Sequence, residues 1–418
     1  MIKPQTLKGF RDFLPREKRK RQYVVSQLTD VFESFGFEPL ETPTLEYEEI
    51  LSGKYGEEGD KLMYRFEDNG KRRVAMRYDQ TVPLSRVVAQ YQNDLPIPFK
   101  RYQIQPVWRA ENTQKGRYRE FLQCDADIVG TFSPLADAEI VATAAKCIEK
   151  LGFKNFKILV NDRENLKFTK DIEGITEEEN LMIIRSVDKL KKIGKDGVIN
   201  ELITNGFSKE VAEKVMQEVE LRKPTLYLSQ IFDALKELGV SEKVIEFSPT
   251  LARGLDYYTG LIFEIEIEEY PVGSVCGGGR YDNLIGMFAG RQIPAVGFAL
   301  GFDRILEAME ALSLFPDDLK SSSTNVLVSI FSESLKQQSL EICSRLRSNN
   351  INTEIYLGEV KEKNPLEKQL KYADQKQIPY IIIIGPEEAE KDVVTLKNLQ
   401  TREQVQKPLD KIIQVLKK

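Results

Sequence analysis

The sequence predicts an α+β protein followed by a separate α/β domain, and three observations support this fold class. Short runs that mix aromatic and β-branched residues dominate 62–130, which indicates strands. From about 164 to 245, lysine, glutamate, leucine and isoleucine recur with helical period, which indicates a helical insertion. After a polar stretch at 312–323, strand and helix patterns alternate to the end of the chain, which is typical of an α/β domain.

The remaining elements follow from local patterns. Apolar residues fall on one face of 16–35, which predicts a helix. The next segment, "GFEPLETPTLE" at 36–46, contains two prolines and is expected to be extended, at an edge or an interface. A second helix is predicted at 133–152, where Ser133 can cap its start. Strands are expected to resume at 260–268 and at 296–301.

Composition excludes several classes of function. The 418 residues carry a net charge of −5, so a uniformly basic coat for nucleic acid is absent. No apolar run approaches the ~20 residues of a membrane span, and the charged N-terminus does not resemble a secretory signal. The four cysteines stand far apart and the chain contains no histidine, so no zinc site is expected. We therefore expect a cytoplasmic protein with reduced thiols, whose chemistry relies on carboxylates, arginines, tyrosines, metal ions or the substrate.

The stretch "VWRAENTQKGRYREFLQCDAD" at 107–127 is the first candidate for chemistry. We expect a strand that carries Arg109 and Glu111, a turn at Lys115 and Gly116, and a returning strand. Side chains two apart share one face of a strand, which puts a row of arginine, aromatic, amide and acid together. That row comprises Arg117, Arg119, Phe121, Gln123, Asp125 and Asp127. Burying it without a ligand is costly, although a solvated hairpin face with salt bridges is an equally weighted alternative.

Three further groups contain ligand-binding residue types. Asp79 and Thr81 precede a helix and can hold an ammonium group, although either can instead be a helix cap. Arg253 precedes a glycine, which allows close approach to a ligand. Tyr257 and Tyr258 would point to opposite faces if that stretch were extended, with strand packing as the alternative role.

The last group, "AVGFALGFDRI" at 295–305, places two glycines before a predicted helix. Arg304 falls in the first turn of that helix, where it can stack on a base or reach phosphate oxygens. Alone, this pattern is weakly specific.

Taken in order, these motifs resemble the histidyl-tRNA synthetases, a family of class II aminoacyl-tRNA synthetases. The resemblance rests on "GFEPLETPTLE", "WRAE…GRYREFLQCD", "ARGLDYYTG", "GGGRYDNL" and "GFALGFDRI", and it covers essentially the full length. It implies a catalytic domain with a six-stranded antiparallel sheet, in a homodimer with Pro43 at the interface. The implied domains are a catalytic domain in two parts (1–163 and 246–311), a helical insertion (164–245), a linker (312–323) and an α/β anticodon-binding domain (324–418).

The resemblance also implies a role for each site residue. ATP, with Mg²⁺ on its phosphates, would be bound by Arg109, Glu111, Arg117, Phe121 and Arg304. The α-ammonium of L-histidine would be taken by Asp79, Thr81 and Gln123. The two imidazole nitrogens would be held by Asp127 and Tyr258, in a pocket shaped by Tyr257 and Tyr281. Arg253 would lie against the carboxylate and α-phosphate, and Arg253 and Arg109 would be the catalytic residues.

The implied activity is the ligation of L-histidine to tRNA(His) through a histidyl-adenylate, with a phosphate oxygen as the base of the second step. The turn at 111–116 would approach the acceptor end of the tRNA. "RYDQT" and "QCDAD" resemble the eukaryotic rather than the common bacterial form. The alternative is a non-catalytic paralogue that binds histidine or uncharged tRNA as a regulator. Arg109, Arg253 and Arg304 are all present, which favours the enzyme.

Overall fold

The structure, a computed structural model, describes residues 2–54, 56–113, 117–253, 257–316, 319 and 322–417. The turn predicted at Lys115 and Gly116, the glycine Gly254 and part of the linker predicted at 312–323 lie outside these residues. The chain divides into two compact units, one formed by 1–12 with 21–315 and the other by 13–20 with 316–418. The domain boundaries drawn from the sequence stay predictions.

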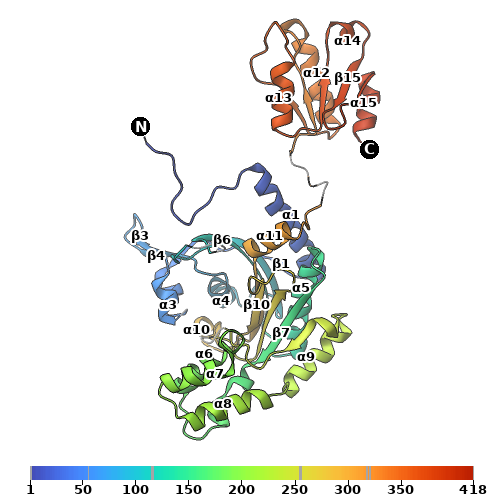
Figure 1. Cartoon of the computed structure of the whole chain (residues 1–418). Helices are drawn as coiled ribbons and strands as arrows, with labels where there is room; N and C mark the ends of the chain where they lie inside the picture. The colour runs from blue at the N-terminus through green and yellow to red at the C-terminus, as the bar shows by residue number, and fades with distance from the viewer. Residues whose placement is uncertain are drawn as a thin grey trace. The chain divides into compact units, whose positions relative to one another are not determined.

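An eight-stranded sheet forms the centre of the first unit (Figure 1). Its strands, in spatial order, are β1 (Glu38–Pro39), β5 (Phe99–Trp108), β6 (Glu120–Val129), β11 (Ala295–Gly301), β10 (Cys276–Arg280), β9 (Leu261–Ile267), β7 (Phe156–Asp162) and β8 (Ile245–Phe247). All neighbours from β5 to β7 pair antiparallel, as the family resemblance implies. The predicted count of six omits β1 and β8, which add parallel pairs at the two edges. These short edge strands are defined by their neighbours, since their own sequences carry little periodicity.

Long helices bury the apolar face of this sheet. The main core is shared by the strands and by α1 (Pro15–Ser34), α5 (Pro134–Lys150), α9 (Leu226–Glu237) and α11 (Phe302–Ala311). The predicted cap is present, because Ser133 Oγ accepts a hydrogen bond from the amide of Leu135 at 3.3 Å. Although α9 falls inside the range predicted as an insertion, it packs on α5 and in this main core.

A smaller sheet with short helices lies beside the first residues of the candidate site. A three-stranded sheet has the order β2 (Leu45–Tyr47), β4 (Arg73–Met76) and β3 (Arg65–Glu67). The short helices beside it are α2 (Glu48–Leu51), α3 (Gly56–Lys61), α4 (Thr81–Gln90) and α10 (Gly286–Ala289). Contacts of α4 with α2 and α10 close a separate apolar cluster, in which the partly buried Tyr257 and Tyr258 also pack.

The helical part of the first unit has a core of its own. Its helices are α6 (Glu177–Val187), α7 (Leu190–Thr204) and α8 (Lys209–Leu221), which lie side by side (Figure 1). The 3-10 turns η1 (Arg163–Leu166), η2 (Phe168–Lys170) and η3 (Glu242–Val244) flank them along the chain. Leu159 of β7 and Ile262 of β9 belong to the same apolar cluster, which anchors these helices to the large sheet.

The second unit is the predicted C-terminal α/β domain. Its sheet has the order β13 (Thr353–Ile355), β12 (Val326–Val328), β14 (Tyr380–Ile383), β15 (Val394–Asn398) and β16 (Gln404–Lys407). The first three pair parallel and the last three antiparallel, and β15 and β16 form a hairpin near the end of the domain. The other elements are η4 (Glu333–Leu335), α12 (Lys336–Ser348), α13 (Glu367–Gln375), α14 (Pro386–Glu390) and α15 (Leu409–Leu416).

Two expectations from composition can be compared with the fold. In the part of the chain that the structure describes, no helix is both long and apolar enough to cross a bilayer. All four cysteines are buried and free. Burial raises the pKa of the thiols of Cys124 and Cys147 well above its usual range, so both stay protonated.

Candidate active site

One cavity of about 410 Å³ lies over the strands β6, β10 and β11 of the large sheet. Every residue to which the family resemblance assigns a binding or catalytic role lines it. These residues are Asp79, Thr81, Arg109, Glu111, Arg117, Phe121, Gln123, Asp127, Arg253, Tyr257, Tyr258, Tyr281 and Arg304. They come from segments far apart in the sequence, and the antiparallel order of the sheet brings them together.

Strand β6 forms the floor of the cavity. Phe121, Gln123, Asp125 and Asp127 occupy alternate positions and all line it, as the strand period predicts. The alternation fails beyond the end of the strand. Arg119 is not among the lining residues, and its Nε donates to the carbonyl oxygen of Glu111 at 3.0 Å.

Arg109 lies beyond the end of a strand, where the sequence predicted it within one. Strand β5 ends at Trp108, so Arg109 and Glu111 belong to the following segment. Arg109 Nε donates to the carbonyl oxygen of Tyr78 at 3.0 Å, and its guanidinium lies 5.1 Å from the centre of the Phe121 ring. These two contacts hold the guanidinium of Arg109 beside the ring of Phe121 on the wall of the cavity.

The two roles considered for Asp79 are compatible. Its Oδ1 accepts a hydrogen bond from the amide of Val82 at 3.1 Å, as a capping side chain does, while the residue also lines the cavity. The adjacent Gln80 is fully buried, and its Nε2 donates to the carbonyl oxygens of Gln105 and Gln123 at 2.9 and 3.1 Å. Gln80 therefore ties the start of α4 to the paired strands β5 and β6.

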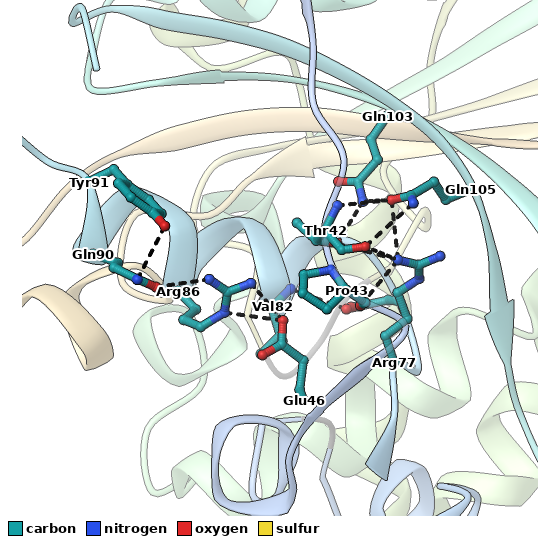
Figure 2. Close-up of polar contacts among 11 residues, drawn as sticks. Thr42, Pro43, Glu46, Arg77, Val82, Arg86, Gln90, Tyr91, Gln103 and Gln105 are labelled. Carbon is teal, nitrogen blue, oxygen red and sulfur yellow. Dashed lines mark hydrogen bonds and ion pairs between the residues drawn. The ribbon is translucent and has the colours of Figure 1, made fainter. Parts of the chain in front are cut away.

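A buried arginine extends this attachment to the extended segment at 36–46, as Figure 2 shows. Arg77 Nη1 donates to the carbonyl oxygens of Thr42 and Pro43 at 2.6 and 3.2 Å, and to Gln105 Oε1 at 3.2 Å. Burial lowers the pKa of Arg77, which the nearby charge of Glu41 opposes. Because the guanidinium of Arg77 donates to oxygens of both the segment 36–46 and β5, it holds that segment against the strand.

Asp127, which lines the cavity, takes part in a buried ion pair. Arg101 of β5 lies opposite Asp127 of β6, and its Nη2 is 2.7 Å from Asp127 Oδ2. The hydroxyl of Tyr281 donates to Asp127 Oδ1 at 2.5 Å. Burial raises the pKa of Asp127, while Arg101 and the hydrogen bond from Tyr281 oppose that shift. No local pattern in the sequence marks Arg101, because only the pairing register places it opposite Asp127.

The adjacent tyrosines both face the cavity. Residues 257–260 do not form a strand, so Tyr257 and Tyr258 do not alternate between faces. Their ring centres are 4.6 Å apart and the rings are tilted by 59°. Burial raises the pKa of Tyr257 to about 12 and that of Tyr258 well above its usual range. Both phenols are therefore hydrogen-bond donors at neutral pH.

The run "CGGGR" proves to be a strand whose glycines make room for functional side chains. Arg253 pairs with Glu264 of β9, and its Nη2 donates to Ser274 Oγ at 2.9 Å. A Cβ atom at Gly277 of β10 would collide with the guanidinium of Arg253. A Cβ atom at Gly297 of β11 would likewise collide with the carboxylate of Asp127. These two glycines therefore allow the sheet and the site to pack closely.

Comparison with known proteins gives the family. A family model described as histidyl-tRNA synthetase matches residues 9–305, and one described as an anticodon binding domain matches 325–418. A histidine–tRNA ligase of Cytophaga hutchinsonii is 40% identical over 100% of both chains. One from Aeropyrum pernix is 41% identical over 100% of this chain and 98% of its own.

The chain belongs to the histidyl-tRNA synthetase family. The crystal structure of a histidyl-tRNA synthetase from a Nostoc species superposes with a TM-score of 0.85 at 31% identity, over 100% of this chain and 99% of that one. The family and the class II fold with its C-terminal anticodon-binding domain, both predicted from the motifs, are therefore confirmed. The roles of the single site residues are not tested by these comparisons and stay predictions.

Within this family fold, the structure adds a group of residues that the sequence analysis did not assign. Asp303 lines the cavity and pairs with Arg21 at 2.6 Å and with Arg11 at 3.0 Å. The guanidinium of Arg11 also lies 3.2 Å from the centre of the ring of Tyr118, another lining residue. Arg304 is held in turn, because its Nη1 donates to the carbonyl oxygen of Ser274 at 2.8 Å. No local pattern signals these contacts, since they join α11 to the N-terminal segment and to Ser274, which are distant in the sequence.

Proposed function

We propose that this chain ligates L-histidine to tRNA(His) with ATP, through a histidyl-adenylate intermediate. The observation that carries this proposal is the convergence of every predicted histidine and ATP ligand in one cavity. Full-length relatives named histidine–tRNA ligase support the same activity.

Histidine is selected at the deep end of the cavity. Asp127 and Tyr258 hold the two imidazole nitrogens, and Tyr257 and Tyr281 complete the walls around the ring. The carboxylate of Asp127 accepts and the phenol of Tyr258 donates, so the pair fixes one imidazole tautomer. Asp79, Thr81 and Gln123 take the α-ammonium. A site built from buried polar groups rejects analogues without matching groups by about 10⁴-fold or more.

Adenylation takes place between two arginines. The histidine carboxylate attacks the α-phosphorus of ATP, a new O–P bond forms, and pyrophosphate leaves. Arg109 and Arg253 lie on the cavity wall, where they stabilise the negative charge that develops on the α-phosphate oxygens. Phe121 and Arg304 enclose the adenine, while Glu111 and Arg117 contact its edge and the phosphates.

ATP is expected to bring Mg²⁺ on its phosphates. Among the residues that the structure describes, no group of three or more metal-ligating side chains is found. Mg²⁺ in nucleotide sites needs only about one or two protein carboxylates, because phosphates and water supply the other ligands. The bound ion neutralises phosphate charge.

The transfer step needs a base that the protein does not supply as histidine, since the chain has none. The 3′-terminal ribose hydroxyl attacks the carbonyl carbon of the adenylate, and AMP leaves. A phosphate oxygen of the adenylate accepts the hydroxyl proton, because it already lies beside the carbonyl. The C-terminal domain binds the anticodon, the protein works as a cytoplasmic homodimer, and Pro43 lies at its interface.

The proposal is tested by histidine-dependent exchange of pyrophosphate into ATP, followed by charging of a tRNA(His) transcript. Purified protein is expected to catalyse both reactions, and to exchange with no other amino acid at a comparable rate. Binding of histidine without exchange would contradict the enzyme assignment and favour a regulatory role.

A further inference from the structure

The floor of the cavity carries a second acid that no role above uses. Asp125 lies between Gln123 and Asp127 on the same face of β6, and only 2% of it is exposed. It comes from the middle of the strand, so the pleat aims it into the cavity in the same direction as its two neighbours. Burying a carboxylate there without a charged partner is costly.

Asp127 has one carboxylate oxygen in a hydrogen bond and the other in an ion pair. Its Oδ2 pairs with Arg101 and its Oδ1 accepts from Tyr281, and the same carboxylate lies against Gly297 of β11. Arg101 is fully buried, so this ion pair is shielded from water. Asp127 is therefore held in one orientation before any substrate arrives.

Asp125, like Asp127, has one hydrogen-bonded oxygen, but its other oxygen has no ion pair among the described residues of the kind that Asp127 Oδ2 makes with Arg101. Asp125 Oδ2 accepts from Gln123 Nε2 at 3.2 Å, but its Oδ1 has no hydrogen-bond partner among the described residues. The bond to Asp125 uses the amide of Gln123 as a donor, and Gln123 Oε1 is also without a partner in the described part of the chain. Two neighbouring acceptors thus lie buried and unsatisfied on the wall of one cavity.

The charges near Asp125 Oδ1 and Gln123 Oε1 indicate which kind of ligand group can donate hydrogen bonds to them. Burial raises the pKa of Asp125 well above its usual range, Arg101 opposes the shift, and the charges of Asp127 and Asp79 add to it. Asp79, Asp125 and Asp127 line the cavity together, and the fully buried Arg101 is paired with Asp127, so the charge of Asp125 is left without an ion-pair partner among the described residues. A primary ammonium group supplies positive charge and several N–H donors at once.

We propose that Asp125 is a further histidine-binding residue, whose Oδ1 accepts a hydrogen bond from the α-ammonium of the substrate together with Gln123 Oε1. Arg101 and Tyr281 orient Asp127 toward the imidazole ring. The two acids of β6 therefore bind different groups of histidine, Asp125 the α-ammonium and Asp127 the imidazole. This inference rests on the proposed function, since histidine is the substrate it assumes.

The test measures binding of two histidine analogues to the full-length protein by calorimetry, without ATP. L-Histidinol keeps the ammonium and imidazole groups, whereas imidazolepropionate lacks the ammonium. Asp125→Asn is expected to weaken histidinol binding by about 10- to 100-fold, the loss typical of a charged hydrogen bond, and to leave imidazolepropionate binding within about 2-fold. Asp94→Asn, at an exposed position, serves as the matched control and is expected to change neither affinity.

The possible outcomes are distinct. Equal losses for both analogues would overturn the inference, because Asp125 would then act on the pocket as a whole. Unchanged histidinol binding with a raised midpoint of thermal unfolding would also overturn it, since Asp125 would then be only a buried charge. Binding of ATP to the Asp125→Asn variant shows whether that variant is folded. If the Asp125→Asn variant is unfolded, the Asp125→Ser variant is used for the same measurements. Absence of exchange by the wild type would contradict the proposed function, whereas the analogue affinities test Asp125 separately.

Discussion

The two ends of the cavity are built differently. At the end of the cavity where we propose that histidine binds, the acids Asp125 and Asp127 are 2% and 3% exposed and stand on the strand β6. At the end where we propose that the phosphates of ATP bind, the side chains of Arg117 and Arg253 are 56% and 41% exposed and stand outside the strands. These two acids thus belong to the folded core, whereas these two arginines lie on segments at its surface.

This difference assigns the two ends different physical tasks. Buried polar groups must be matched by a ligand, so they discriminate strongly between similar amino acids. Exposed arginines are already hydrated, so they discriminate little and contribute when charge develops on phosphate. Changes at the buried end should therefore alter stability and selectivity, and changes at the exposed arginines should alter rate.

The largest effect is expected from breaking the buried ion pair. Arg101→Met leaves Asp127 charged and without its partner, which should lower the free energy of unfolding by about 3–5 kcal/mol. Denaturant titration measures this loss. The double variant Arg101→Met, Asp127→Leu removes both charges and should recover most of the stability. If the single and double variants were equally unstable, the ion pair would not be what holds this end of the cavity.

The exposed arginines are tested by Arg253→Ala. Loss of a cation that stabilises the transition state should lower the rate of pyrophosphate exchange by about 100-fold or more. The midpoint of thermal unfolding should stay close to that of the wild type, because this side chain is partly exposed. Arg291→Ala, at an exposed position, is the matched control. A large fall in stability with an unchanged rate would reverse the assignment of the two ends.

Asp127→Asn sharpens the comparison within the buried end. An amide can present a donor where the ring nitrogen needs an acceptor, which should cost histidine binding about 1–3 kcal/mol. The KM for histidine is expected to rise while the KM for ATP is unchanged, as steady-state exchange kinetics will show. An unchanged KM for histidine would make Asp127 a structural acid only.

The smallest expected effect is a release of protons when histidine binds. The pKa of Asp125 is raised by burial, so part of this carboxyl is protonated in the free protein at pH values where an exposed aspartate is ionised. A bound ammonium favours the carboxylate and lowers that pKa. Histidine binding should therefore release a fraction of a proton, and affinity should increase as pH rises through the raised pKa. Calorimetry in buffers of different ionisation enthalpy measures the release, which Asp125→Asn should reduce. Equal release by both proteins would show that another group titrates.

The sequence by itself determined which residues face the cavity from β6, because a strand alternates its side chains with a period of two. Gln123 and Asp127 follow from that local rule, and so does Asp125, whose place on the same face was predicted although its role was not. The helix that presents Arg304 also follows from local signals, since glycine precedes its first turn. The family could be predicted because its motifs are contiguous stretches of sequence.

Only the tertiary structure decided which residues support these side chains. Arg101 meets Asp127 through the register of β5 against β6, and Arg11 reaches Asp303 from the far end of the sequence. The strand nature of "CGGGR" depends on its neighbours β9 and β11, because glycine carries no strand signal of its own. Register and close packing arise from the whole sheet, so no local pattern in the sequence encodes them.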